Sequence, residues 1–277
     1  MSENAEDQFD MRSDEELLQV ALTETDEEVA WRAIAALHRR GSRDIFERAR
    51  GLCLSKNAHE RRVAVDILAQ LGLPDATFHE EVMITLLGML EQEQEPEVLS
   101  SIGSALGHQH DGRAVAPLAR FKHHADEGVR FGVVMGLLTL EDELAVQTLI
   151  ELSTDADADV RDWATFGLGS QIELDTPAIR EALVARLSDE DEDTRGEAMV
   201  GLARRHDSRM VAPLLTDLEH GYSGSLTLEA ATEIADPLLY PALLALQTTW
   251  EGDRDNWLYH QLEEAIEACR PIDSPLT

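Results

Sequence analysis

Apolar residues recur along the chain with the period of an α-helix, and the helical segments themselves recur at a nearly constant distance. The clearest copies start at Val129, Val160 and Thr194, each with an arginine one residue on, a small or apolar residue four on and a leucine eight on. Residues four and eight apart share one face of a helix, so each copy predicts an amphipathic helix. Weaker copies start at Val29, Glu60, Val98, Leu226 and Leu258.

A second apolar-periodic stretch separates successive copies, as at residues 115–121, 144–152, 179–187 and 211–218. Each unit is therefore predicted to be a helix A, a short turn and a helix B, with about ten to twelve residues in each helix. Neither helix can bury its apolar stripe alone, so the units must stack into one continuous core. The predicted fold is an all-α, right-handed α-solenoid of about eight helix pairs.

Residues that can cap helices stand before these stretches. Ser13 with Glu16 and Thr25 with Glu28 have the spacing of a capping box, and Thr176 precedes a proline at a helix start. We expect three segments: an acidic, disordered tail over residues 1–13, a single solenoid domain over 14–270 and a C-terminal tail over 271–277.

The chain is strongly acidic, with 55 Asp and Glu against 23 Lys and Arg and a formal net charge of −32. Such a surface repels nucleic acid and anionic lipid and attracts basic proteins. The predicted partner is therefore a basic protein, with neither nucleic acid nor a membrane as a partner. A saline cytoplasm or a GC-rich genome would also account for the composition.

Two cysteines, Cys53 and Cys269, stand far apart with no companion at metal-binding spacing, which indicates a reducing compartment. The polar N-terminus has no apolar signal-peptide region, and no apolar run is long enough to span a membrane. We expect a cytoplasmic protein.

The repeated unit Asp-x-x-Val-Arg-x-x-Ala-x-x-x-Leu, with helix A written Arg-x-Val-x-Pro-Leu at residues 113–118 and 209–214, resembles a known family. It looks like the short HEAT repeats first described in phycobilisome lyases, over nearly the whole chain. Within it, residues 155–219 most resemble bacterial HEAT-repeat proteins that lie beside polymorphic-toxin genes in rhs elements, several of which are suspected immunity proteins. The resemblance implies the HEAT fold and is much less specific for activity.

Histidines are the obvious candidates for a metal site: His59-Glu60, His79-Glu80, the pair 123–124, and His108 with His110. HEAT-repeat hydroxylases bind two irons through His-Glu pairs at matching positions of helix B, and here only His59-Glu60 starts a helix B. HEAT-like DNA glycosylases need a basic face, and this charge has the wrong sign. We therefore expect no metal, no cofactor and no catalytic residue.

The repeated arginines Arg61, Arg130, Arg161 and Arg195 each stand one residue after a helix B start. In HEAT repeats this position usually pairs with the capping Asp of a neighbouring unit, which predicts a structural ladder. The side of helix B away from the core lines the concave surface of HEAT arrays. We therefore predict that the partner binds to residues on that side, namely Trp31, Phe131, Met135, Asp162, Trp163, Phe166, Glu197 and Glu229. Phe131, Met135, Trp163 and Phe166 come from adjacent units and are expected to form one aromatic patch; packing between neighbouring B helices would be the alternative.

Three functions fit the sequence. The first is a non-catalytic binding protein, an immunity-type protein that neutralises a basic toxin domain. The second is a bilin lyase or isomerase that uses the concave aromatic residues and an acid such as Asp162. The third is a generic scaffold whose acidity reflects its habitat.

Overall fold

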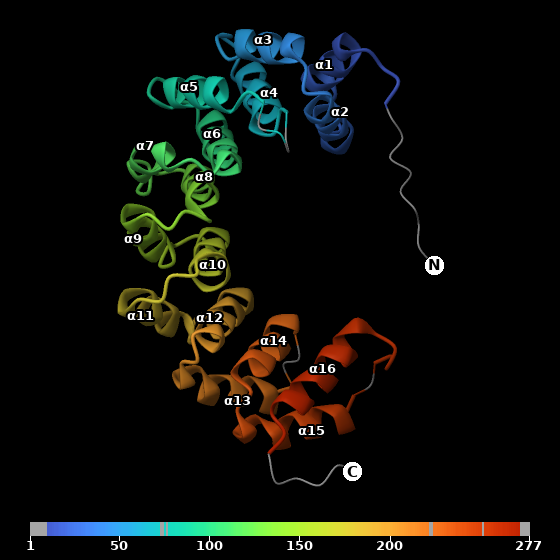
Figure 1. Cartoon of the computed structure of the whole chain (residues 1–277), viewed down its shortest axis with the longest axis vertical. Coiled ribbons are helices and arrows are strands. Elements are labelled where there is room, and N and C mark those ends of the chain that lie inside the picture. Colours follow the sequence, from blue (N-terminus) through green and yellow to red (C-terminus); the bar gives the residue numbers. More distant parts are fainter. Residues whose placement is uncertain (1–9, 73–74, 76, 222–223, 251, 272–277) are drawn as a thin grey trace. The chain divides into compact units, whose positions relative to one another are not determined.

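The computed structural model describes residues 10–72, 75, 77–221, 224–250 and 252–271, and these residues form two compact units, Met1–Gly136 and Leu137–Thr277. No strand occurs over these ranges. Within each unit, consecutive helices pair antiparallel and the pairs stack in sequence order, which is the α-solenoid architecture (Figure 1).

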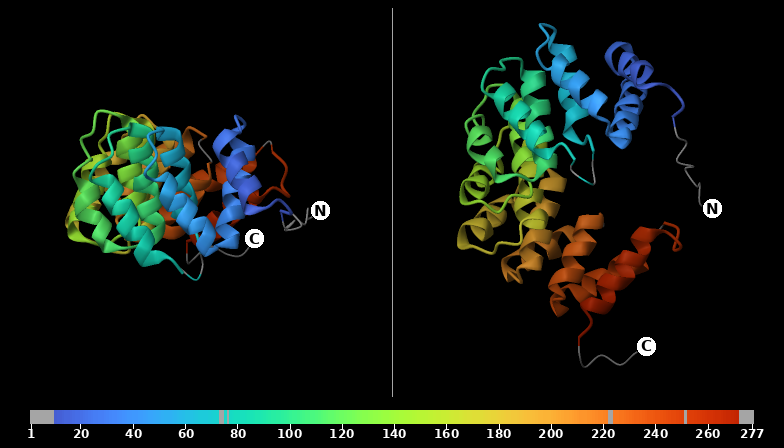
Figure 2. Two further views of the ribbon diagram at one scale, coloured as in Figure 1. Left: turned by 90° about the horizontal axis from the view of Figure 1, so that it is seen from above. Right: turned by 45° about the horizontal axis from the view of Figure 1, so that its top comes forward.

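The first unit begins with three long pairs and ends with a shortened one. Its helices are α1 (Asp14–Thr23), α2 (Glu27–Arg40), α3 (Arg43–Leu52), α4 (Ala58–Ala69), α5 (His79–Leu90), α6 (Pro96–Gln109), the 3₁₀ turn η1 (Gly112–Ala114), α7 (Val115–Ala119) and α8 (Glu127–Leu137). The odd-numbered helices of this unit form one row and the even-numbered helices another (Figure 1), and Figure 2 shows them from two further sides.

The second unit repeats the arrangement. Its helices are α9 (Glu143–Leu152), α10 (Ala158–Phe166), the π-helix η2 (Gly167–Gln171), α11 (Pro177–Arg186), α12 (Glu192–Arg204), η3 (Ser208–Met210), α13 (Val211–Glu219), α14 (Ser225–Ile234), η4 (Pro237–Leu239), α15 (Tyr240–Thr248) and α16 (Trp257–Ala268). Odd-numbered helices are the A helices and even-numbered helices the B helices, so every predicted helix B is present.

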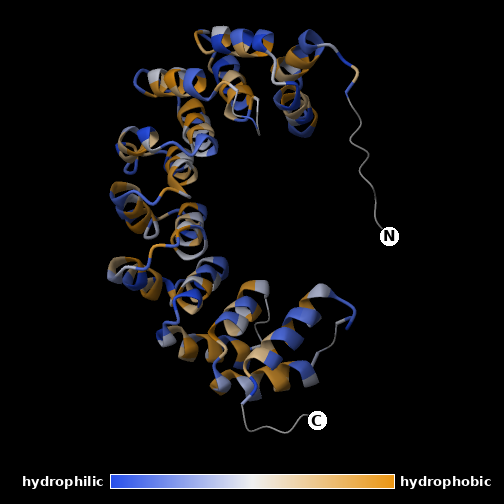
Figure 3. Ribbon diagram, viewed as in Figure 1, coloured by the Kyte–Doolittle hydropathy of each residue, from blue (hydrophilic) through white to orange (hydrophobic). Residues whose placement is uncertain are grey.

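The core follows the predicted stripe of the B helices. In α6 the stripe residues Val98, Ile102 and Leu106 are completely buried, and every residue four places after a helix B start is buried. The register is less regular in α14, where Leu226 and Ile234 are half-buried and Leu228 is fully buried instead. Figure 3 shows hydrophobic and hydrophilic positions on the helices of both units, as expected for amphipathic helices with one packed side.

The first helix starts as predicted. Ser13 and Glu16 form a capping box, with the Ser13 backbone N–H donating to Glu16 Oε2 at 2.7 Å and the Glu16 N–H donating to Ser13 Oγ at 3.3 Å. The Thr25 prediction was wrong. Asp26 is the N-cap of α2 and accepts from the N–H groups of Glu28 and Val29, because its carboxylate sits one residue closer to the helix start.

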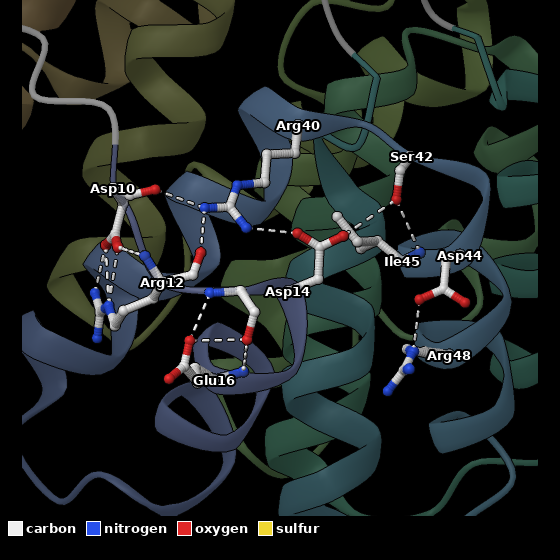
Figure 4. A network of polar contacts seen from close by, with 10 residues as sticks. Asp10, Arg12, Asp14, Glu16, Arg40, Ser42, Asp44, Ile45 and Arg48 are labelled. Carbon is white, nitrogen blue, oxygen red and sulfur yellow. Dashed lines mark hydrogen bonds and ion pairs between the residues drawn. The ribbon is translucent and has the colours of Figure 1, made fainter.

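Figure 4 shows how the chain before α1 is held against α2. Arg40 donates to Asp14 Oδ1 at 2.5 Å and to the carbonyl oxygens of Asp10 and Arg12 at 2.6 Å each. Residues 10–13 of the predicted tail are therefore tied to the first helix pair, while residues 1–9 and 272–277 of the predicted tails lie outside the described residues.

The repeated arginines form a ladder, with a different acceptor from the one predicted. Arg161 donates to both carboxylate oxygens of Asp189 at 3.1 and 3.2 Å and to the Asp155 carbonyl at 2.9 Å. Asp189 is not the cap: it accepts from the N–H of Asp191, and Asp191 caps α12. Arg61 pairs in the same way with Glu93, at 2.7 and 2.9 Å.

Candidate functional site

Five of the eight predicted partner-binding residues lie on the B helices of the second unit. Asp162, Trp163 and Phe166 belong to α10, Glu197 to α12 and Glu229 to α14, and α12 packs against both of the other helices. None of the five is fully buried. These five residues are called the second-unit B surface below.

The aromatic part of this surface is a pair of perpendicular rings. Trp163 is 37% exposed, and its ring centroid lies 5.6 Å from that of Phe166 with an interplanar angle of 82°. Edge-to-face packing of this kind fixes both rings. The two rings therefore form a rigid, partly exposed apolar contact area.

Asp162 stands beside the rings without a cation. Its Oδ1 atom is buried and accepts no hydrogen bond among the described residues. Burial is the main cause that raises the pKa of Asp162 to about 6, and the negative charges of Asp193, Asp191 and Asp159 raise it further.

Glu197 is the next carboxylate in the row. Burial raises its pKa to about 7, and the neighbouring Asp162 adds to the shift. Ser170 donates a 3.3 Å hydrogen bond to Glu197 Oε2, and this bond and the charge of Arg204 oppose the shift only in part. The charge of Asp162 on α10 thus acts on a partly buried carboxylate of the adjacent helix α12.

Glu229 closes the row and does have a cation. Arg204 Nη2 donates to Glu229 Oε1 at 2.8 Å, and Arg204 Nη1 donates to the Ser170 carbonyl at 3.2 Å. Arg204 therefore pairs with the Glu229 end of the row, and its charge also opposes the raised pKa of Glu197. The Asp162 end carries net negative charge next to the aromatic pair.

A π-helix and a buried arginine place these groups. Gly169 and Gly201 touch so closely that a Cβ on Gly201 would lie 2.5 Å from the Gly169 Cα atom, which lets η2 approach α12 and brings Ser170 to Glu197. Arg205, 9% exposed, donates five hydrogen bonds of 2.8–3.0 Å to the carbonyl oxygens of Leu168, Gly169, Ile172, Leu174 and Gly201. The role of Arg205 was not predicted from the sequence, where it stands only as a second arginine next to Arg204 at the end of a helix B.

The remaining three predicted residues lie in the first unit. Phe131 and Met135 are half-buried on α8. Trp31 on α2 is 51% exposed, and its ring centroid lies 6.5 Å from that of His38. Since Phe131 and Met135 belong to a different unit from Trp163 and Phe166, a single aromatic patch made of all four stays a prediction.

The histidines mainly serve as hydrogen-bonding groups. His59 Nε2 lies 3.1 Å from the Leu22 carbonyl, and His79 Nε2 lies 3.1 Å from Asp111 Oδ2. His79 starts α5, which is a helix A, and His108 lies in the last turn of α6. Among the described residues, no group of three or more His, Cys, Asp or Glu side chains is arranged to hold a metal ion.

Both cysteines are buried as free thiols, and burial raises the pKa of Cys53 to about 12 and that of Cys269 to about 11. Neither is activated as a nucleophile. None of the helices described has both the length and the apolar character needed to cross a bilayer.

Comparison with known proteins identifies the repeats. Residues 84–169 and 146–235, together more than half of the chain, match the family described as HEAT repeats. Protein YibA of Escherichia coli strain K12 is 33% identical over 115 residues, and so is Protein YibA of strain O157:H7. That match spans 42% of this chain and only 41% of the relative's length.

Solved structures share the fold over a longer range. The X-ray structure of Escherichia coli YibA covers 93% of this chain and 92% of its own, with a TM-score of 0.73 and 23% identity. The crystal structure of an engineered protein covers 91% of this chain and 77% of its own, with a TM-score of 0.53 and 19% identity. At these identities the likeness concerns the fold alone.

Proposed function

From the premise that this chain belongs to the HEAT-repeat family, we propose that it is a non-catalytic scaffold that binds a basic protein through its second-unit B surface. Stacked helix pairs offer an extended face whose exposed residues can vary without disturbing the core. The net charge of −32 favours encounter with a basic partner and disfavours nucleic acid.

The observation that carries this proposal is the state of Asp162 and Glu197. Both carboxylates are partly buried, both have a raised pKa, and Asp162 Oδ1 has no hydrogen-bond donor among the described residues. A carboxylate in this state costs folding free energy at neutral pH, so a partner that supplies a cation offsets that cost on binding. Trp163 and Phe166, already ordered by their mutual contact, add apolar area at low entropic cost.

More specifically, we propose that this is an immunity-type protein and that its basic partner is a toxin domain. The resemblance of residues 155–219 to HEAT-repeat proteins beside toxin genes supports this form. Co-expression with a toxin domain encoded next to this chain is expected to restore growth, and the Trp163→Ala variant is expected to restore it less.

The binding experiment isolates a partner from the source organism by cross-linking and then measures both rate constants across ionic strengths. Trp163→Ala or Phe166→Ala should cost about 2 kcal/mol, chiefly through faster dissociation, because desolvated aromatic anchors hold the complex together. The Asp162→Asn/Glu197→Gln double variant should instead slow association and reduce its salt dependence.

Matched controls lie on the same unit. Trp257→Ala removes a tryptophan that is 62% exposed on α16, and Glu233→Gln removes an exposed charge on α14. Both should bind like the wild type. If the acid variants bind with unchanged rates and stability rises with salt for all of them, the acidity is a habitat adaptation and the basic-partner proposal fails.

A second candidate is a bilin lyase or isomerase, and one observation favours it. Carboxyl groups with pKa values of about 6 and 7 can donate a proton near neutral pH, as a general acid must. Mixing the protein with phycocyanobilin tests it directly: a shift of the bilin absorption band that Asp162→Asn abolishes would favour this candidate over the scaffold.

A further inference from the structure

The first unit contains a second candidate site, separate from the second-unit B surface. A cavity of about 470 Å³ opens between α2 and α4, beside the end of α1. Its floor is apolar and buried, formed by Ala21, Ile34 and Val63. Its wall is the Trp31 indole, which is 51% exposed.

Polar contacts join the helices in the region of the cavity. His59, which lines the cavity on α4, reaches the Leu22 carbonyl at the end of α1, and His38 on α2 lies 2.8 Å from the Asp66 carbonyl on α4. α2 packs against α4 much less extensively than α6 does, which leaves room for the cavity. A preformed space of this size is typical of a binding pocket.

The rim of the cavity is acidic. Glu24, Glu27 and Glu97 line it, and none of the three forms an ion pair within the part of the chain described here. Arg62, which also lines the cavity, is directed to Asp66, 3.1 Å away on the same helix, and Arg61, whose charge acts on Glu97, is paired with Glu93. The local charge therefore attracts a cation and repels an anion.

An exposed indole, an apolar floor and unpaired carboxylates together match one side chain. A guanidinium stacks flat on an aromatic ring while its N–H groups donate to carboxylates, and its aliphatic stem covers apolar surface. An ammonium is a strongly hydrated point charge and gains less from the flat indole.

The chain uses the same combination within its own fold. The guanidinium carbon of Arg43 lies 4.7 Å from the centroid of the Phe78 ring, and Arg43 Nη1 pairs with Glu81 at 2.6 Å. At Trp31 the ring and the carboxylates are present, and Arg62, the arginine that lines the cavity, is paired with Asp66 instead.

We propose that the Trp31 cavity binds an arginine side chain of a partner polypeptide. This deepens the proposed function, since it gives the basic partner a recognisable feature and a second contact on the first unit. It does not depend on the second-unit B surface, which contains none of the cavity residues.

The test uses the full chain and N-acetyl-arginine amide as the probe, observed through the Trp31 indole N–H signal by NMR. Saturable binding is expected with a dissociation constant on the order of 1–10 mM, which is reasonable for a ligand of this size. N-acetyl-citrulline amide, which has the same shape without the charge, should bind at least about tenfold more weakly, and so should N-acetyl-lysine amide.

Variants complete the test. Trp31→Ala should abolish binding, which is then monitored through the NMR signals of Arg62. Glu27→Gln/Glu97→Gln should weaken binding about fivefold or more. Trp257→Ala serves as the matched control and should leave binding unchanged. Both replaced sites are solvent-exposed or at the cavity rim, and circular dichroism checks their fold. Equal binding of citrulline or lysine amide, or unchanged binding by the glutamate variants, would overturn the assignment to arginine. Because the probe is a single amino acid, these outcomes do not depend on the existence of a protein partner.

Discussion

The two units differ in how a partly buried carboxylate on a B helix is compensated. In the first unit, Asp66 on α4 is buried enough to raise its pKa, but Arg62 one turn earlier lies 3.1 Å away and opposes that shift. In the second unit, Asp162 lies on the B side of α10, its Oδ1 atom accepts no hydrogen bond among the described residues, and its pKa rises to about 6. The second unit also buries Arg205 among carbonyl groups rather than against a carboxylate.

This difference separates charge that stabilises a repeat from charge that is available to a partner. An arginine one turn from an acid neutralises it within the helix, and such pairs need nothing from outside. The second unit does contain paired charges, such as Arg161 on α10 with Asp189 in the turn before α12, and Arg204 with Glu229. On the B side of α10, however, the Oδ1 atom of Asp162 accepts no hydrogen bond among the described residues, and the charge of Asp162 raises the pKa of Glu197.

The largest effect is expected from Arg205→Met in the second unit. Its five carbonyl acceptors lose their donor, and burial prevents water from replacing all of it, so the free energy of unfolding should fall by about 3–5 kcal/mol. Urea denaturation followed by circular dichroism measures this. Arg32→Met, which removes an exposed arginine of the first unit that is paired only with Glu28 one turn away, should change little. If the two variants are equally stable, the buried cation is not a structural element of this unit.

The second largest effect is a gain. Glu197→Gln removes a carboxylate whose pKa is raised from its ordinary value of 4.5 to about 7, so at pH 8 the free energy of unfolding should rise by about 1–3 kcal/mol. Asp66→Asn in the first unit should give no such gain, because it leaves Arg62 without its partner. A loss of stability in Glu197→Gln would show that the Glu197 carboxylate stabilises the fold and is not a charge left available to a partner.

The pH profile of the wild type should reveal the same carboxylates. A carboxyl group whose pKa is raised on folding stabilises the fold while protonated and loses that contribution as the pH rises through the folded value. With values of about 6 for Asp162 and about 7 for Glu197, stability should increase by about 1–2 kcal/mol between pH 8 and pH 5.5. The Asp162→Asn/Glu197→Gln variant should lack this increase. At much lower pH the sign reverses, since the pKa of Asp111 and of Asp207 is lowered by Arg113 and Arg209.

The smallest effect is expected from a variant that leaves an acid of the first unit without its cation, as Asp162 is in the second. Arg62→Met leaves Asp66 without its cation, so the pKa of Asp66 should rise further and the free energy of unfolding should fall by about 1 kcal/mol. NMR titration of the Asp66 carboxyl measures the pKa change. An unchanged pKa would mean that Arg62 does not neutralise this acid, and the contrast between the units would then need another explanation.

The sequence by itself determined the repeat, the pairing of helices and the side of each helix B that faces the core. Those features depend on spacing along one helix: Val98, Ile102 and Leu106 share a face whatever lies next to it. The same reasoning placed Trp31, Asp162 and Glu197 away from the core, and each is at least partly exposed. Capping depended on a choice between neighbouring polar residues, which is why Ser13 was predicted correctly and Thr25 was not.

Only the tertiary structure decided which of these exposed residues act together. The contact of Gly169 with Gly201 sets how closely η2 approaches α12, and that distance brings Ser170 to Glu197. The loose packing of α2 on α4 likewise leaves the cavity beside Trp31. Helical spacing gives the direction in which a side chain points, but the pKa of a carboxylate and the volume of a cavity depend on what neighbouring helices bring within a few ångströms, which no single helix encodes.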